Sequence, residues 1–360
     1  MESASLSSKR FTAIWQSKDN GADWPLRDWL MHVFEPFISR CIYDPNHEIV
    51  MDDAILFDSF VYRNDPEYYK KFKGKNAFLV DIGDEFLELG VDRYVHFRGV
   101  FRHIWSSVFN PRHVMVFPLG YYNKGTGDRA VSASDRRYAW SFVGEGAKVS
   151  RPDMVRAMSS IEPHVCFSST RIRGLTFFSR SSAGKKRIPS QEFVQMLAQS
   201  AFAPAPMGNG TLESCRVYDA LEAGAIPILE RRWTLDYFKG LLGDHPLPTV
   251  TSWAQGHDLV VRLLQDPEKL NELQQTCMQW WKSYQSALIG KIEMFIEERS
   301  LANDELVPLR SQLPRWAFWQ YAELLRHHSF PAIRRRTTLQ LARVARQRMW
   351  RSAATRWGQA

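Results

Sequence analysis

The chain has 360 residues, a length that suits two domains of ordinary size better than one small core. Hydrophobic residues make up 44% and charged residues 24%, as in soluble globular proteins. The net charge of +8 is concentrated at one end: nine arginines and no acidic residue follow Glu323, which leaves about −1 for the rest. A near-neutral body argues against a nucleic-acid-binding domain, because such a domain needs a basic face.

The cysteines and the apolar segments indicate the cellular compartment in which the protein is expected. Four cysteines, none in CxxC spacing, argue against a disulfide framework or a zinc site and favour a reducing cytoplasm. The first residues lack a basic segment followed by an apolar core, so we expect no signal peptide. No stretch approaches the roughly 18 apolar residues of a transmembrane helix.

Two series of alternating apolar and helix-like segments follow in chain order. In the first, strands are expected at residues 10–16, 54–60, 76–84, 93–101 and 113–121, with helix-like segments at 25–37 and 66–72. In the second, strands are expected at residues 138–145, 164–169, 201–206, 225–230 and 247–253. Its helices are expected at residues 151–161, 190–200, 212–223, 234–242 and 256–298. Such alternation predicts an α/β fold with parallel sheets and right-handed crossovers.

A polar stretch rich in Gly and Ser, residues 123–137, separates the two series and is predicted to be the domain linker. The predicted boundaries are an N-terminal domain at 1–138 and a C-terminal domain at 139–300. A ligand of such a protein is expected in the crevice at the carboxyl ends of the strands.

The segment "PMGNGTLESCRVYDALEAG", residues 206–224, carries the strongest motif. Gly208 and Gly210 permit an unusual turn, Thr211 is a candidate N-cap, and Gly224 is a candidate left-handed stop. A helix N-terminus binds diphosphates through its free N–H groups, and Arg216 can add bidentate bonds to a phosphate. Ordinary helix capping would explain the same pattern, since glycine turns before helices are common.

The same residues resemble the signature of exostosin-like glycosyltransferases. The matching positions are Phe202, Pro206, Gly208, Ser214, Arg216, Asp219, Ala220, Leu221, Gly224, Ile226 and Pro227. The upstream segments "LVDIGDE", "FRGVFRHIW", "MVFPLGYYN" and "YAWSFVGEGAKVSRPDM" are similar to that family in the same order, closest to its ribitol-xylosyltransferase-like branch. The resemblance covers residues 75–250.

The resemblance implies a GT-B architecture, in which two Rossmann-like domains face a central cleft. It implies an inverting, metal-independent transfer of a sugar from a nucleotide-sugar donor, UDP-linked, to a hydroxyl of a glycan or glycolipid acceptor. The donor would bind the C-terminal domain, with no further cofactor. The family often has Glu where this chain has Asp219, whose shorter side chain puts a direct donor contact in doubt.

Three groups of residues are candidates for the donor site. Around the main helix they are Gly208, Gly210, Glu213, Ser214, Arg216 and Asp219, where Glu213 would accept a hydrogen bond from a ribose or sugar hydroxyl. After the first strand of the second series they are Gly144, Lys148 and Arg151, which also suit a helix-capping region. In a polar loop they are Arg180, Lys185 and Arg187, which also suit a solvated surface turn.

An inverting transfer needs a general base for the acceptor hydroxyl. Asp84 and Glu85 follow a predicted buried strand of the N-terminal domain and are the candidates, although Asp84 also suits a helix cap. Arg102 and His103 could face the donor, but a lone histidine after a strand is more often structural. Catalytic roles are therefore expected for Asp84 or Glu85 and for Arg216.

The C-terminal part is predicted to hold an aromatic-rich helix at 301–331, packed back on the N-terminal domain, and a basic tail at 332–360. The tail could rest on an anionic membrane surface near a lipid-linked acceptor, or be disordered.

Two other functions stay open: a non-catalytic partner subunit or carbohydrate-binding paralogue, and a nucleotide-sugar epimerase of the same fold. The sequence does not identify the donor sugar or its nucleotide base, the acceptor and linkage, the catalytic base or the oligomeric state.

Overall fold

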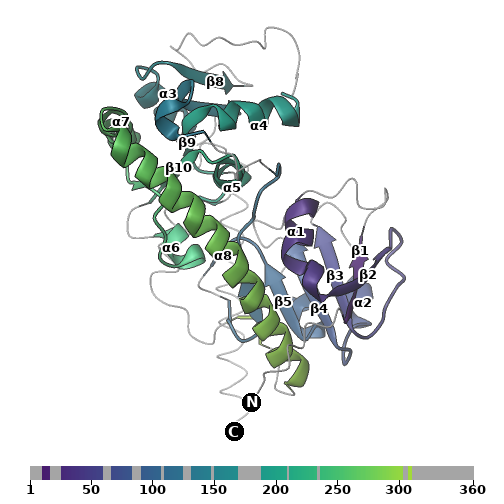
Figure 1. Ribbon diagram of the computed structural model, residues 1–360. Coiled ribbons are helices and arrows are strands. Elements are labelled where there is room, and N and C mark those ends of the chain that lie inside the picture. The colour runs from purple at the N-terminus through teal and green to yellow at the C-terminus, as the bar shows by residue number, and fades with distance from the viewer. Residues whose placement is uncertain are drawn as a thin grey trace, which may run out of the picture. The chain divides into compact units, whose positions relative to one another are not determined.

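The computed structural model divides the chain into two compact units (Figure 1). Unit 1 comprises Met1–Trp24, Phe34–Phe117 and Lys291–Ala360, and unit 2 comprises Pro25–Val33 and Pro118–Gly290. The structure describes residues 10–16, 26–59, 66–82, 91–106, 109–124, 131–146, 150–168, 188–208, 211–232, 236–302 and 307–309.

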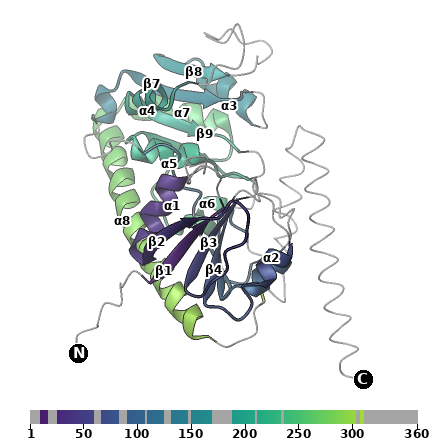
Figure 2. The ribbon, with the colours of Figure 1, turned by 90° about the vertical axis from the view of Figure 1, so that its right-hand side faces the viewer.

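Unit 1 is built on a six-stranded sheet in the order β2-β1-β3-β4-β5-β6 (Figures 1 and 2). Its strands are β1 (Phe11–Trp15), β2 (Ile38–Tyr43), β3 (Ala54–Ser59), β4 (Ala77–Ile82), β5 (Gly99–Arg102) and β6 (Val114–Val116). All neighbours pair in parallel; Leu56 of β3 lies opposite Leu79 of β4, for example. Every side chain of β4 is buried and all but Asp81 are apolar, as is typical of a sheet covered on both faces.

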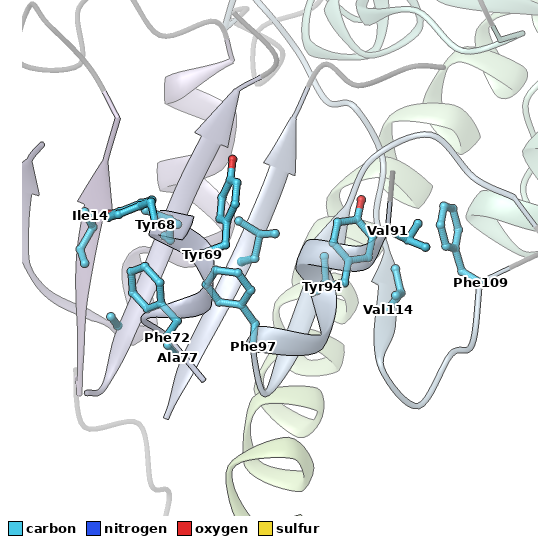
Figure 3. Close-up of a cluster of buried hydrophobic side chains, with 14 of the residues drawn as sticks. Ile14, Tyr68, Tyr69, Phe72, Ala77, Val91, Tyr94, Phe97, Phe109 and Val114 are labelled. Atoms are coloured by element: carbon cyan, nitrogen blue, oxygen red, sulfur yellow. The ribbon is translucent and has the colours of Figure 1, made fainter. Parts of the chain in front are cut away.

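Aromatic side chains fill the core on one face of this sheet (Figure 3). Helix α2 (Pro66–Lys70) and the turn after it supply Tyr68, Tyr69 and Phe72, and Phe97 stacks on Phe72 with ring centroids 5.1 Å apart. Figure 3 shows these rings over the strands that carry Ile14 and Ala77. Each large ring removes much apolar area from water, so this cluster stabilises unit 1 strongly.

Unit 2 contains a five-stranded parallel sheet in the order β11-β10-β9-β7-β8. Its strands are β7 (Tyr138–Gly144), β8 (His164–Ser168), β9 (Ser200–Ala205), β10 (Ile226–Glu230) and β11 (Thr249–Val250). Its helices are α3 (Arg151–Met158), α4 (Ser190–Ala198), α5 (Cys215–Glu222), α6 (Tyr237–Leu242) and α7 (Trp253–Leu264). Two further helices, α1 (Arg27–Phe34) and α8 (Pro267–Leu301), have residues in both units. The prediction of two α/β domains with parallel sheets is therefore confirmed.

The predicted stop of helix α5 is confirmed. Gly224 has φ +68°, its N–H donates to Leu221 O at 3.1 Å, and the Ala225 N–H donates to Ala220 O at 2.8 Å. This pair of bonds is the Schellman motif, which glycine completes without strain.

Several predicted elements differ from the structure. Residues 93–101, predicted as one strand, form a 3-10 helix at Asp92–His96 and strand β5 at Gly99–Arg102. Helix α5 begins at Cys215 instead of residue 212, because the Thr211 hydroxyl accepts the Glu213 N–H within a turn and caps no helix. The long helical stretch is two helices, since Pro267 starts α8 and has no N–H with which to continue α7. Strand β2 was not predicted, because three consecutive exposed residues, Ser39, Arg40 and Cys41, interrupt the apolar pattern at an edge of the sheet.

The units divide between Phe117 and Pro118, ahead of the predicted boundary at residue 138. Much of the predicted linker is tied to unit 2: the Ala133 N–H donates to Gln274 Oε1 of α8 at 2.8 Å. Residues 119–123 are also bonded to unit 2, as described below. The described residues of the predicted linker, 123–124 and 131–137, therefore belong to unit 2, and residues 125–130 lie outside the described part of the chain.

The predicted C-terminal helix and basic tail lie almost wholly outside the described residues. The described residues 307–309 belong to unit 1, where Leu309 bridges Phe109 and Val307 O accepts from the Asn110 side chain at 2.8 Å. Within the part of the chain that the structure describes, no helix has the length and apolar character needed to cross a bilayer.

Candidate functional site

The carboxyl edge of the unit 2 sheet gathers the predicted donor-site residues that the structure describes. Strand β7 ends at Gly144 and leads to Arg151 at the start of α3. Strand β9 leads through Gly208 to Ser214 and Arg216 at the start of α5. Parallel strands bring these turns to one edge of the sheet, which is where α/β proteins bind ligands.

Arg216 carries a buried charge at this edge. Its guanidinium carbon lies 4.5 Å from the centre of the Phe142 ring, and its Nη2 donates to Val143 O at 2.8 Å. Its Nε and Nη1 are buried and have no hydrogen-bond partner among the described residues. Burial, and next the charge of Arg151, lower the pKa of Arg216 to about 9, although Asp219 acts in the opposite direction.

Arg151 brings a second guanidinium to the same place. Its Nη1 donates to Glu145 O at 2.9 Å and its Nε to Met207 O at 3.3 Å. A Cβ atom added at Gly144 would lie 2.8 Å from Arg216 Nη2 and 3.7 Å from Arg151 Nη1. Two cations therefore approach the backbone closely at Gly144, and a larger residue there would require the Arg216 side chain to shift. Burial lowers the pKa of Arg151, while the nearby Glu145 and Glu230 raise it.

The start of α5 adds polar groups. Ser214 is the N-cap residue with extended backbone angles, yet its side chain caps no N–H, and its Oγ is buried without a hydrogen-bond partner among the described residues. Gly208 approaches the backbone closely, since an added Cβ would lie 2.6 Å from Glu213 O. The N–H groups of the first turn of α5 and the free Ser214 hydroxyl suit an anion.

Glu213 is held inside unit 2. One carboxylate oxygen accepts the Leu119 N–H at 2.6 Å and the Tyr218 hydroxyl at 2.5 Å. The other accepts the Tyr237 hydroxyl at 2.9 Å. The predicted bond to a ribose or sugar hydroxyl would therefore have to displace one of these donors.

Asp219 is likewise engaged by the protein. Its Oδ1 accepts the N–H groups of Tyr122 and Asn123, both at 2.8 Å. Burial raises the pKa of Asp219 to about 6, although both N–H bonds and the charge of Arg216 act against this. Asp219 thus fixes residues 122–123 against α5, which gives this carboxylate a structural task distinct from the predicted donor contact.

A group that the sequence did not single out lies at the end of β10. Glu230 Oε2 accepts the Ser150 hydroxyl at 2.5 Å and the Met207 N–H at 2.9 Å, and Oε1 pairs with Arg232 at 2.6 Å. The available signal was a carboxylate ending the apolar run "AIPILE". Only the sheet order places it beside the turns after β7 and β9.

Several predicted site residues lie outside the described residues. These are Asp84, Glu85, Lys148, Arg180, Lys185, Arg187 and Gly210. Their roles stay predictions. The expectation of metal independence also stays a prediction; among the described residues, no group of three or more His, Cys, Asp or Glu side chains is arranged to hold a metal ion.

The carboxyl edge of the unit 1 sheet holds Arg102 and His103 in a closed network. Asp81 Oδ2 accepts from the Tyr94 hydroxyl and pairs with Arg93 and Arg102, each at 2.8 Å. His103 is buried, with its Nδ1 3.3 Å from Asp81 O, and burial lowers its pKa to about 3, helped by the charge of Arg102. Arg102 and His103 therefore support the fold of unit 1, in agreement with the structural interpretation of the histidine.

Comparison with known proteins gives one family. The model of the RXYLT1 C-terminal domain matches residues 121–301, which include every described donor-site residue named above. The match does not name the exostosin-like family itself. No curated protein sequence matches the chain significantly.

Solved structures give distant likenesses. A crystal structure of an alpha1,3-fucosyltransferase has a TM-score of 0.49 and 12% identity, covering 85% of this chain and 94% of that one. The same type of enzyme with GDP has a TM-score of 0.48 and 13% identity over the same shares. The glycosyltransferase SnogD from Streptomyces nogalater has a TM-score of 0.35 and 14% identity, covering 79% and 99%.

Proposed function

The chain belongs to the family of the RXYLT1 C-terminal domain, and from this premise we propose that it is a GT-B glycosyltransferase with a nucleotide-sugar donor. The donor binds the carboxyl edge of the unit 2 sheet. It is UDP-linked, and the sugar passes with inversion to a hydroxyl of a glycan or glycolipid acceptor. The nucleotide, the inversion and the acceptor class follow from the sequence resemblance. The residues at the carboxyl edge of the unit 2 sheet support the binding of the donor.

One observation carries the proposal: the guanidinium groups of Arg216 and Arg151 converge at Gly144, and Arg216 forms no ion pair with a carboxylate among the described residues. Arg216 keeps two buried nitrogen atoms without a partner among the described residues, over the Phe142 ring. Burying an unpaired cation is costly, and proteins usually pair such charges. A diphosphate supplies two negative charges and acceptor oxygens for both arginines, for Ser214 Oγ and for the first N–H groups of α5.

The same groups suit the chemistry of sugar transfer. The acceptor oxygen attacks the anomeric carbon while the bond to the diphosphate oxygen breaks, and the diphosphate leaves with the electron pair. Arg216 and Arg151 stabilise the charge that grows on the leaving group, which lowers the barrier. The acceptor proton goes to a general base, for which Asp84 or Glu85 is proposed.

Calorimetric titration of the full chain with UDP, GDP, CMP and their sugars, with and without EDTA, tests the proposal. We expect one nucleoside diphosphate to bind in the presence of EDTA. Arg216→Ala should weaken its binding by about 2 kcal/mol, because a charge-assisted hydrogen bond is lost.

Arg156→Ala is the matched control. Arg156 is an exposed arginine on α3, paired with Asp153 at 2.6 Å and absent from the proposed site, so its loss should leave binding unchanged. If the folded wild-type protein binds none of the nucleotides, the proposed glycosyltransferase function is wrong. The alternative function as a non-catalytic partner subunit is then favoured.

A further inference from the structure

Glu230 connects the segments on which the proposed donor site is built. It ends β10 and is almost fully buried, with 5% of its surface exposed. A buried carboxylate is stable only when it is paired and hydrogen-bonded. Glu230 satisfies this rule with three groups from three places in the chain: Arg232, the Ser150 hydroxyl and the Met207 N–H.

Met207 links Glu230 to the first arginine. Its N–H donates to Glu230 Oε2 at 2.9 Å, while its carbonyl oxygen accepts from Arg151 Nε at 3.3 Å. The next residue, Gly208, donates its N–H to Thr211 O at 2.9 Å in the turn that leads to α5. The position of the Met207 backbone therefore affects both the Arg151 guanidinium and the turn before Arg216.

Ser150 gives Glu230 a second connection to the same arginine. Ser150 is the N-cap of α3, but its hydroxyl donates to Glu230 and caps no N–H of the helix. Arg151 is the next residue, so Glu230 holds the backbone on one side of Arg151 through Ser150 and a partner of its side chain through Met207. Its charge also acts on Arg151, whose pKa it raises.

We propose that Glu230 is a positioning residue for the diphosphate clamp: it fixes Arg151 relative to Arg216 through Ser150 and Met207. The inference rests on the proposed function, since it assigns Glu230 to that same site. Glu230 does not touch the donor. It acts through Arg151, and its negative charge offsets part of the repulsion between the two guanidinium groups.

Titration of UDP into the wild type, Glu230→Ala, Arg151→Ala and the double variant tests the proposal. Glu230→Ala should weaken UDP binding about tenfold, and the double variant should bind no more weakly than Arg151→Ala, because coupled residues are not additive. Glu230→Gln should recover part of the loss, since its amide oxygen can still accept the Met207 N–H. It also keeps the test valid if Glu230→Ala fails to fold.

Glu222→Ala is the matched control, because Glu222 is a half-buried carboxylate of α5 whose partners, Trp281 and Gln285, lie on α8. It should lower the melting temperature without changing UDP affinity. Hydrogen exchange at the Met207 amide of the nucleotide-free protein gives a second readout, and should be faster in Glu230→Ala than in Glu222→Ala.

The outcomes separate the two proposals. Additive losses in the double variant, or equal effects of Glu230→Ala and Glu222→Ala on UDP affinity, would overturn the positioning role while the donor site stands. No UDP binding by the wild type, with faster Met207 exchange in Glu230→Ala, would overturn both and leave Glu230 as a structural group only.

Discussion

The carboxyl edges of the two sheets both hold buried guanidinium groups, but those of unit 1 form ion pairs with Asp81, whereas Arg216 of unit 2 forms no ion pair with a carboxylate among the described residues. In unit 1, Arg93 and Arg102 both pair with Asp81. In unit 2, Arg216 contacts a carbonyl oxygen and an aromatic ring, and its second neighbour is another cation, Arg151. The difference shows how to tell a structural charge from a ligand-binding one.

The buried aspartates at the two edges, Asp81 and Asp219, differ in the direction of their pKa shifts. Burial alone would raise the pKa of Asp81, but the charges of Arg93 and Arg102 outweigh burial and the pKa is lowered. Asp219 accepts backbone N–H groups, and burial raises its pKa to about 6. Asp81 therefore has two arginine partners in unit 1, whereas in unit 2 two buried nitrogen atoms of Arg216 lack a hydrogen-bond partner among the described residues. Under the proposed function, a bound diphosphate would stabilise unit 2.

The largest expected effect comes from breaking the network of unit 1. Asp81→Asn should lower the free energy of unfolding by about 3 to 5 kcal/mol, because it removes the carboxylate with which both buried arginines pair. Urea denaturation measures the loss. Asp153→Asn, in an exposed pair with Arg156, should cost less than about 1 kcal/mol. Similar losses in the two variants would contradict the assignment of Asp81 to the core of unit 1.

Asp219→Asn tests the acid of unit 2 through pH. The folded pKa of about 6 lies above the ordinary value of 3.8, so Asp219 costs no stability below pH 3.8 and destabilises the fold as the pH rises toward 6. That difference corresponds to at most about 3 kcal/mol. Since asparagine keeps an oxygen for the N–H groups of Tyr122 and Asn123, the variant should lack this loss. Parallel stability curves of variant and wild type between pH 4 and 6 would refute the prediction.

The smallest effect on stability, with the opposite sign to that of Asp81→Asn, is expected at Arg216. Arg216→Met should raise the free energy of unfolding of the nucleotide-free protein by about 1 to 2 kcal/mol, because an apolar side chain of similar length replaces a desolvated cation. Nucleotide binding should be lost in the same variant. Denaturation with and without nucleotide measures both effects, and a destabilised variant would show that Arg216 is a structural charge like Arg102.

Local patterns in the sequence predicted several features well. The Schellman stop at Gly224 follows from a few neighbouring residues, and most strands of the two parallel sheets, β2 excepted, follow from apolar runs. The convergence of Gly144, Arg151 and Arg216 also followed from the rule that polar residues after parallel strands meet at one edge. The start of α5 was less accessible, because Thr211 suits both an N-cap and a turn.

The sequence by itself determined the α/β class, the two parallel sheets and the edge where the arginines gather, because periodicity and strand ends are local properties of the chain. Only the tertiary structure decided which charges are neutralised. Glu213 and Asp219 look like donor-site acids in the motif, yet they accept N–H and hydroxyl groups from residues 24 to 97 positions away and, for Glu213, also from Tyr218 of α5. Glu230 emerged only when the turns after β7, β9 and β10 were brought together. A hydrogen-bond partner that is distant in the chain leaves no local sequence pattern. Only the fold therefore distinguishes a carboxylate that already accepts hydrogen bonds from the protein from an arginine whose buried nitrogen atoms have no such partner among the described residues.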